Sequence, residues 1–565
     1  MKRVQFLLMI LGISLSAIAQ PNINEDGILN AASYVPSGLP NSGIAQGSMF
    51  VLFGRDLGPP DLKMADQFPL PTSEGLAGTS VRVNVGGLVT NAIMVYTSAK
   101  QVAAILPSKT LIGEGTLTLS YNGLTSAPTR IRVVRSAFGI FSRNQAGTGP
   151  AIVQNVNSET DRPLNALIDA ARPSQTVILW GTGLGSVSGN EAAGPLPGDL
   201  SIETEVLVGN RRAKVIYKGR SGCCAGIDQI VFELPPDAEG CYVPVAVKAG
   251  GVVSNFATLS ISSNARVCSD PHGFASTDLE TLSKSGEIRL GSITISRTNS
   301  TVTVPQGTVT FNTDLGSAAF LRYDLAKALA TGGSSGGGSD VLQILPIPFG
   351  SCLVYTFRGS SLAVEEPIRP DPMDAGPSLN LTGPKGLRRF LRKAYGVYSV
   401  EFGGGIPGMP GEGQPEYLDP GRYLLDNGTG GRDVGPFRAT LDIGSPFVWS
   451  NRDDVAAVRR SQDLAVTWKG ADAEKEFVVI MGVSISPSQV GGAFLCSERP
   501  NIGAFIIPAS VLSSLPASGL EQGIPTALLQ VGKLPRAQIS KFSAPGLDLG
   551  YFSFSAISAK YVTYQ

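Results

Sequence analysis

The chain contains a single histidine, His272, in the stretch CSDPHGF at residues 268–274. A Ser-His-Asp or Cys-His catalytic device would have to use this residue, because imidazole is the base that activates such nucleophiles near neutral pH. His272 follows a proline in a segment between two strand-rich regions, where nothing orients its ring. We interpret it as a solvated linker residue, which argues against the commonest hydrolase and metalloenzyme mechanisms.

Carboxylates in the C-terminal half offer a second kind of chemistry. Glycoside hydrolysis needs two carboxyl groups that face each other across the scissile bond, and carboxylate oxygens in loops also suit Ca²⁺. No D-x-D-x-D-G loop is present, so calcium is only a candidate cofactor, and the sequence does not show which carboxylates face each other. We expect ordinary loop carboxylates, with a hydrolase as the alternative. The candidates are Glu412, Glu416, Asp419, Asp426 and Asp433.

The stretch VILWGTGLGSVSG at residues 177–189 is similar to a phosphate-binding loop, because an apolar run ends in a cluster of glycines. A dinucleotide loop also needs a helix that begins at the glycines, whose amide groups hold the pyrophosphate. The following residues 186–201 contain three more glycines and two prolines. No helix of useful length begins there, so we predict no cofactor.

A cationic stretch, KGLRRFLRKAYG at residues 385–396, is the main local concentration of charge. Its spacing predicts a helix with several cations on one face. Such a face is either simply solvated or contacts an acidic polysaccharide or lipid headgroups. The cations are Lys385, Arg388, Arg389, Arg392 and Lys393.

The chain has six cysteines, and in an exported protein these favour disulfides. Four cluster between residues 223 and 268, which suggests two bridges among them and a third between the two distant cysteines. Because Cys223 and Cys224 are adjacent, we expect each to pair elsewhere, since a bridge between them would strain the peptide. No C-x-x-C pair supports a metal site. The other cysteines are Cys241, Cys268, Cys352 and Cys496.

The N-terminus predicts export. Residues 1–19 combine a basic start, a short apolar run and the A-x-A pattern of a signal-peptide cleavage site. No later segment has the roughly 20 apolar residues of a membrane span. The 45 Lys and Arg balance 45 Asp and Glu, so the charge gives no reason to expect a nucleic-acid partner. We therefore expect a secreted, periplasmic or cell-surface protein.

An internal repeat changes how the glycine stretch is understood. Residues 47–58, GSMFVLFGRDLG, match residues 174–185, SQTVILWGTGLG, at an offset of 127. QVAAILP at 101–107 matches QIVFELP at 229–235 at an offset of 128, and NGLTSAP matches GGVVSNF at the same offset. Ordered anchors at a nearly constant offset indicate two copies of one unit. We expect Phe53 and its counterpart Trp180 to pack in the cores, with the glycines allowing the turns.

Each unit reads as short, β-branched strands between glycine and asparagine turns, which is typical of an immunoglobulin-like sandwich. The segments GILNAASY, SAFGIFS, GPAIVQN and RPSQTVILWGTGLG resemble exported acidobacterial proteins with a tandem IPT/TIG-like module of unknown function. The resemblance covers about residues 27–262. It implies an immunoglobulin-like fold and export, and it supplies no catalytic residues.

The sequence thus predicts an all-β chain of tandem immunoglobulin-like β-sandwiches followed by a larger β-rich C-terminal region. Trp449 and Trp468 lie in strand-like contexts of that region, and we expect them in its core. We expect a non-enzymatic binding, adhesion or scaffold protein whose partner is a polysaccharide or a protein at the cell surface. The predicted segments are a signal peptide at 1–19, repeats at 27–139 and 147–262, a C-terminal region at 272–565 and a flexible Gly/Ser segment at 332–339.

Overall fold

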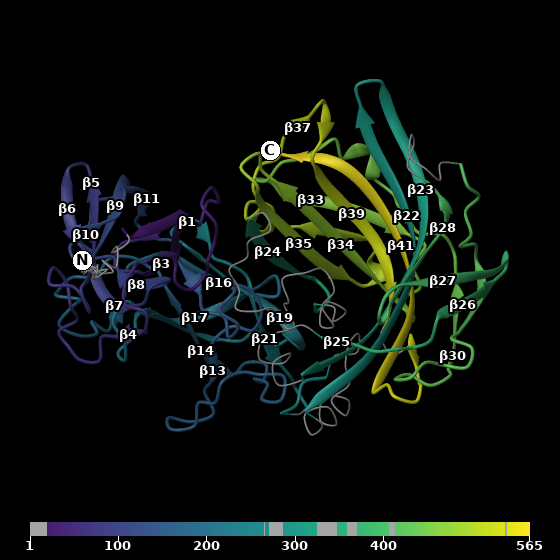
Figure 1. Cartoon of the computed structure of the whole chain (residues 1–565), viewed down its shortest axis with the longest axis horizontal. Helices are drawn as coiled ribbons and strands as arrows, with labels where there is room; N and C mark the ends of the chain where they lie inside the picture. The colour runs from purple at the N-terminus through teal and green to yellow at the C-terminus, as the bar shows by residue number, and fades with distance from the viewer. Residues whose placement is uncertain are drawn as a thin grey trace, which may run out of the picture.

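The computed structural model shows an all-β molecule whose three parts follow one another along its longest axis (Figure 1). Two β-sandwiches are followed by a larger, strongly curved sheet. The helical pieces of the described residues are short: α3 (Ala509–Leu512), η2 (Arg452–Asp454) and η3 (Pro500–Ile502). The part of the chain that is described contains no helix long and apolar enough to cross a membrane. The structure describes residues 20–264, 266–269, 286–324, 347–358, 370–405, 413–536 and 539–565.

The first sandwich packs two mainly antiparallel sheets face to face around one apolar core. Alternation of apolar and polar residues, as in β5, buries one side of each strand and exposes the other. One sheet contains, in order, β1 (Asn22–Asn30), β3 (Met49–Arg55), β8 (Gln101–Ile105), β7 (Ile93–Thr97) and β4 (Lys63–Met64). The other contains β2 (Ile44–Ala45), β11 (Thr129–Val134), β9 (Gly113–Tyr121), β5 (Thr79–Val85) and β6 (Leu88–Asn91), with β10 (Leu124–Thr125) beside β9.

The second sandwich has the same plan, with one strand shared between its two sheets. The first half of β17 pairs with β16 and the second half with β18, so the strand crosses from one sheet to the other. One sheet contains β12 (Gly139–Ile140), β13 (Val153–Asn155), β14 (Thr176–Thr182), β18 (Asp228–Glu233), β17 (Arg211–Arg220) and β15 (Gly198–Asp199). The other contains β16 (Thr204–Val208), β19 (Gly240–Ala249), β20 (Val252–Val253) and β21 (Ala257–Ile261).

Strand register is the same at one matched pair of residues in the two copies of the sequence repeat. In the first sandwich Phe53 of β3 lies opposite Gln101 of β8. In the second sandwich Trp180 of β14 lies opposite Gln229 of β18. The two pairs are the same residues in the alignment of the repeats, and a slip of one residue in either sheet would break the correspondence.

Two details of the glycine stretch differ from expectation. Phe53 and Trp180 are only half-buried, because they point away from the cores that Leu52 and Leu179 enter on the opposite face. Gly181 lies inside β14 rather than at a turn. A Cβ there would be 2.2 Å from the ring of Phe138, so close packing requires this glycine. Gly183 and Gly185 do have positive φ, at 105° and 145°.

The two sandwiches are joined by buried polar contacts. The Arg220 guanidinium donates to the carbonyl oxygens of Gly47 in the first sandwich, at 2.6 Å, and of Gly185 in the second, at 2.8 Å. It also forms a fully buried ion pair with Asp228, which accepts the amide hydrogen of Leu184. Between the sandwiches, Glu191 accepts two hydrogen bonds from Ser108.

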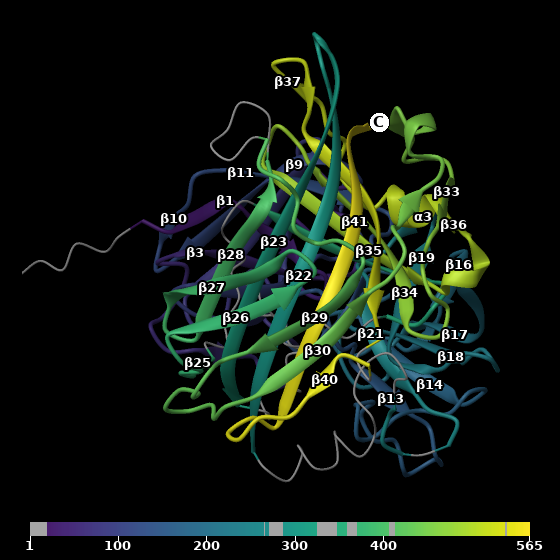
Figure 2. The same cartoon turned by 90° about the vertical axis from the view of Figure 1, so that its right-hand side faces the viewer.

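The C-terminal region is built on one sheet of fifteen strands, whose long members β22, β23 and β41 cross the molecule (Figure 2). The tip of the β22–β23 hairpin projects beyond its neighbours in both views. The central order is β24 (Ser351–Arg358), β35 (Val490–Glu498), β34 (Glu476–Ile485), β39 (Ala527–Pro535), β41 (Leu549–Tyr564), β22 (Glu287–Val304), β23 (Gly307–Asp324), β28 (Val397–Gly404), β27 (Gly386–Ala394), β26 (Ser378–Gly383), β29 (Gly421–Asp426) and β30 (Arg438–Ile443). At its edges lie β25 (Asp371–Pro372), β32 (Ala457–Val458) and β40 (Lys541–Phe542).

The curved sheet encloses two apolar cores and contacts the second sandwich. Trp449 and Trp468 are buried in one of these cores, as the sequence predicts. That core reaches into the second sandwich through Phe256. A separate cluster joins Tyr242 of β19 to Leu290 of β22. The smaller sheets are β31 (Val448–Trp449), β33 (Leu464–Lys469) and β36 (Ala504–Ile507), and the pair β37 (Leu520–Glu521) and β38 (Ile524–Pro525).

All six cysteines form disulfides, and one pairing corrects the expectation from the sequence. Cys352 and Cys496 face each other across β24 and β35 and are bridged, as expected. Cys223 and Cys224 are bridged to each other, so the prediction that each pairs elsewhere was wrong. The remaining bridge joins Cys241 to Cys268. The adjacent pair lies in the loop between β17 and β18.

Candidate functional site

Several residues singled out in the sequence lie outside the described residues. These are His272, Glu412 and the Gly/Ser segment 332–339. The remaining candidate carboxylates, Glu416, Asp419, Asp426 and Asp433, are described.

Glu416 and Asp419 lie in the same segment, and each forms an ion pair with a basic side chain. Arg297 of β22 forms ion pairs with Glu416, at 3.1 Å, and with the buried Asp314 of β23, at 2.7 Å. Lys385 forms an ion pair with Asp419 at 2.8 Å and also donates to the carbonyl oxygen of Glu416. These contacts tie the segment after residue 413 to the sheet. Both carboxylates are ion-paired, and their side chains remain 35% and 41% exposed.

Asp433 belongs to a separate cluster of charges around Tyr395. Its carboxylate accepts hydrogen bonds from the Tyr395 hydroxyl at 3.0 Å and from the amide of Asp374 at 2.8 Å. The pKa of Asp433 is lowered, first by that amide hydrogen bond and then by Arg432. Arg392 contacts Asp374, whose pKa is lowered mainly by the amide of Gly376. Both carboxyls are therefore held ionised at neutral pH, which does not suit a general acid.

Asp426 stabilises the turn that follows β29. Its carboxylate accepts hydrogen bonds from the Asn380 side chain at 3.0 Å and from the amide of Gly428 at 2.9 Å. Within the described ranges, no group of three or more His, Cys, Asp or Glu residues is arranged to hold a metal ion.

The cationic stretch forms a strand, β27, so the predicted helix was wrong. Arg389 and Lys393 alternate with the exposed Leu387 and Leu391 on the outer face of β27. Phe390 points the other way and is fully buried. The alternation has the period of a strand, and the repeated cations obscured it in the sequence. Opposite Arg389 lies Asn380, which is hydrogen-bonded to Asp426, so this face carries both signs of charge.

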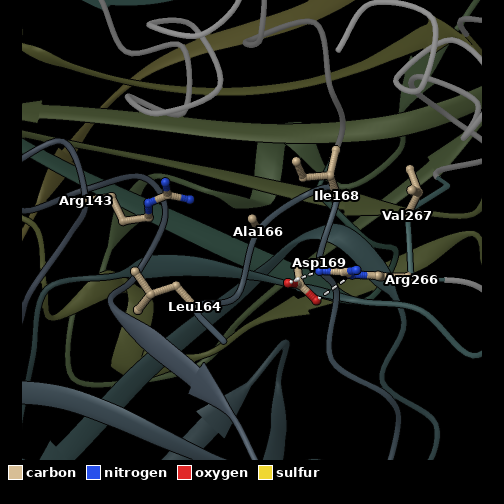
Figure 3. A pocket seen from close by; sticks show the side chains of 7 residues that line it. All are labelled: Arg143, Leu164, Ala166, Ile168, Asp169, Arg266 and Val267. Carbon is tan, nitrogen blue, oxygen red and sulfur yellow. Dashed lines mark hydrogen bonds and ion pairs between the residues drawn. The ribbon is translucent and has the colours of Figure 1, made fainter. Parts of the chain in front are cut away.

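An open hollow on the second sandwich is a candidate site for a ligand (Figure 3). It has a volume of about 450 Å³ and opens widely to solvent. Four of its side chains are apolar, and Leu164 and Ile168 are 47% and 45% exposed. The residues that line it are Arg143, Leu164, Ala166, Ile168, Asp169, Arg266 and Val267.

The frame of the sandwich positions the hollow. The loop between β13 and β14 contains most of the residues that line the hollow, and two buried asparagines fix this loop by hydrogen bonds. Asn165 donates to the Ser260 carbonyl oxygen at 2.8 Å, and Asn155 donates to the Asp169 carbonyl oxygen at 2.9 Å. On the other side, the Cys241–Cys268 bridge fixes the segment that carries Arg266. The walls are thus anchored to the core rather than to a free loop.

The two arginines of the hollow differ in their partners. Arg266 forms a two-fold hydrogen bond with the Asp169 carboxylate, at 3.1 and 2.8 Å, and this contact raises the pKa of Arg266. Arg143 lies on the opposite side, with its guanidinium turned toward the hollow (Figure 3). No carboxylate of the described residues lies within ion-pair distance of Arg143. The hollow therefore has a net positive charge and one cation that a ligand can engage.

Sequence reasoning missed this site. The segment RPLNALIDAARP at residues 162–173 contains apolar residues without the period of a strand, and this was the only available signal. Arg143 and Arg266 are far apart in the sequence, and only the closure of the sandwich brings them to one hollow.

Comparisons with known proteins give the chain no family. No protein-family model matches it, and no curated protein matches it. Among solved structures, it is similar to the extracellular region of plexin A4, with 12% identity over 43% of this chain and 18% of that one, at a TM-score of 0.14. It thus spans less than a fifth of the plexin structure.

Two further structures are similar at the same low level. Domains 5–6 of the S-layer protein SbsC share 13% identity over 43% of this chain and 100% of that one, at a TM-score of 0.16. Immunoglobulin domains 1–4 of sidekick-1 share 10% identity over 95% of this chain and 100% of that one, at a TM-score of 0.12. Such scores carry no argument about function, so the function has to be argued from the site.

Proposed function

We propose that this chain is an exported, non-enzymatic binding and scaffold protein that holds a protein partner in the hollow of its second sandwich. The observation that carries the proposal is the hollow itself, in which exposed apolar side chains surround an arginine without a carboxylate partner among the described residues. A ligand for this site buries an apolar group against Leu164 and Ile168 and places a carboxylate on Arg143.

A peptide segment supplies both groups, with an apolar side chain next to an Asp or Glu. An acidic polysaccharide supplies the carboxylate. The lining includes no aromatic ring for a sugar to stack on, so the chemistry favours a protein. Among the described candidate carboxylates, Glu416, Asp419 and Asp433 form ion pairs with Arg297, Lys385 and Arg432, which supports a non-enzymatic role.

A peptide array tests this proposal. The full chain from residue 20 is applied to synthetic peptides that pair Asp or Glu with Leu, Ile or Phe, to neutral counterparts, and to an array of acidic oligosaccharides. We expect binding to the acidic apolar peptides, weaker at high salt. Arg143→Glu should reduce the affinity on the order of tenfold or more, because it replaces a charge-assisted contact with repulsion.

The matched control is Arg132→Glu, which changes an exposed arginine of β11 in the first sandwich and should leave binding unaltered. Equal loss in both variants would show that only net charge matters. Binding to acidic oligosaccharides without peptide binding would overturn the choice of a protein partner.

A further inference from the structure

The three disulfides differ sharply in their exposure to solvent. Cys241, Cys268, Cys352 and Cys496 are at most 3% exposed. Cys223 and Cys224 are both exposed, at the tip of the loop between β17 and β18. Thiol–disulfide exchange requires that a thiolate reach a sulfur atom, so an external thiol can reach this bridge and not the other two.

The loop with the exposed bridge also contacts the first sandwich. Its two ends are Arg220 and Asp228, which form a buried ion pair, and the Arg220 guanidinium also donates to the carbonyl oxygen of Gly47 in the first sandwich. Within the loop, the Gly226 carbonyl oxygen accepts a hydrogen bond from Thr182 at 2.6 Å. The Thr182 hydroxyl oxygen in turn accepts the amide of Met49 in the first sandwich at 2.8 Å. The bridge lies between these two contacts in the sequence.

Packing in the loop leaves little room for another conformation. Gly226 has a φ of 71°, and a Cβ there would be 2.6 Å from the Ile105 side chain of the first sandwich. Ala225 packs in an apolar cluster with Leu70 and Ile105. A bond between adjacent cysteines restricts the backbone of both residues, so it favours the one loop conformation that fits these contacts.

We propose that Cys223–Cys224 is a thiol-exchange site for a dithiol reductant, and that opening it loosens the joint between the two sandwiches. A thiolate of the reductant attacks one Sγ, forms a mixed disulfide and releases the other cysteine as a thiolate. The second thiol of the reductant then displaces the first cysteine. Two electrons and two protons pass from the dithiol, which becomes a disulfide, to the cysteine pair, which becomes two thiols.

The surroundings of the bridge assign the two sulfur atoms different roles. The buried Ser221 hydroxyl lies 2.9 Å from Cys223 Sγ. Because the bonded sulfur carries no proton, the hydroxyl is the donor, and this donation stabilises a thiolate that forms on Cys223. Exchange is faster when the leaving thiolate is more stable. Cys223 is therefore the leaving group, and the reductant attacks Cys224 Sγ. Ser221 is thus a positioning residue for the exchange.

Limited reduction of the native full chain tests the site. Dithiothreitol is followed by iodoacetamide and peptide mass mapping. We expect Cys223 and Cys224 to be alkylated on the order of tenfold faster or more than the other four cysteines. Ser221→Ala should slow their reduction several-fold without making another bridge reactive. Equal reactivity of all three bridges, or no reaction at Cys223 and Cys224, would overturn the proposal.

Hydrogen exchange tests the joint. After selective reduction, we expect faster amide exchange in the loop from 221 to 227 and at Met49 and Leu184, with no change around the buried bridge Cys352–Cys496. The double variant C223S/C224S should show this faster exchange without reductant and should not respond to dithiothreitol. Unchanged exchange in both the reduced protein and the variant would separate the bridge from the joint and overturn the second half of the proposal.

Discussion

At the scale of single residues, the buried pair of Arg220 and Asp228 lies at the contact between the two sandwiches. Both side chains are at most 3% exposed. Burial raises the pKa of Asp228, while the Arg220 charge and the Leu184 amide act in the opposite direction. Removing these two charges from water has a free-energy penalty. The Arg220 hydrogen bonds fix the position of Gly47 in one sandwich relative to Gly185 in the other.

Arg220→Ala should lower the free energy of unfolding by about 3–5 kcal/mol, because it leaves a buried carboxylate and two carbonyl oxygens without their partner. The matched control is Arg211→Ala on the same strand, β17. Its ion pair with Asp237 is exposed, so the loss should stay below about 1 kcal/mol. Urea denaturation of both variants gives the comparison. Equal losses would contradict the role of Arg220 as a joint.

At the scale of elements, the strands and the repeat could be predicted because β-branched alternation and turn glycines are local signals. The matching register of Phe53 and Trp180 follows from these local signals. The half-burial of both side chains does not follow from them, because the whole sandwich decides which face of a strand meets the other sheet. Likewise the bridge of Cys223 to Cys224 and the hollow around Arg143 depend on loop conformation, which sequence spacing does not encode.

Gly181→Ala tests how closely β14 packs on its neighbours. The new methyl group would lie 2.2 Å from the Phe138 ring and 2.3 Å from the Gly139 carbonyl oxygen. We expect a loss of about 1–3 kcal/mol in the stability of the second sandwich, measured by thermal unfolding. Gly194→Ala is the control, because no atom lies within 4 Å of its added Cβ. It should change stability by no more than about 0.5 kcal/mol. A tolerated Gly181→Ala would mean that Phe138 moves aside freely.

At the scale of the whole molecule, the two sandwiches and the curved sheet act as one frame. The second sandwich lies in the middle (Figure 1), with a polar joint to the first sandwich and apolar contacts through Phe256 and Tyr242 to the C-terminal region. The proposed ligand site, the exposed disulfide and the bridge Cys241–Cys268 all belong to this central part. A scaffold role needs such a frame, because a hollow on a loose domain would not hold its walls in place.

The bridge Cys352–Cys496 should contribute most to the stability of the C-terminal region, because it joins residues 144 positions apart. A cross-link limits the unfolded chain more when it closes a longer loop. C352A/C496A should therefore lower the free energy of unfolding by about 2–5 kcal/mol. C223A/C224A, whose cysteines are adjacent, should lower it by about 1 kcal/mol or less.

Tryptophan fluorescence can follow this loss in the C-terminal region alone. The chain has three tryptophans, and in a Trp180→Phe background the signal comes only from Trp449 and Trp468, both buried in the core beside the bridge. The urea midpoint of that signal should fall in C352A/C496A and stay in place in C223A/C224A. If both variants moved it equally, loop closure would not explain the effect. The exposed bridge would then stabilise the distant sheet through the joint between the sandwiches.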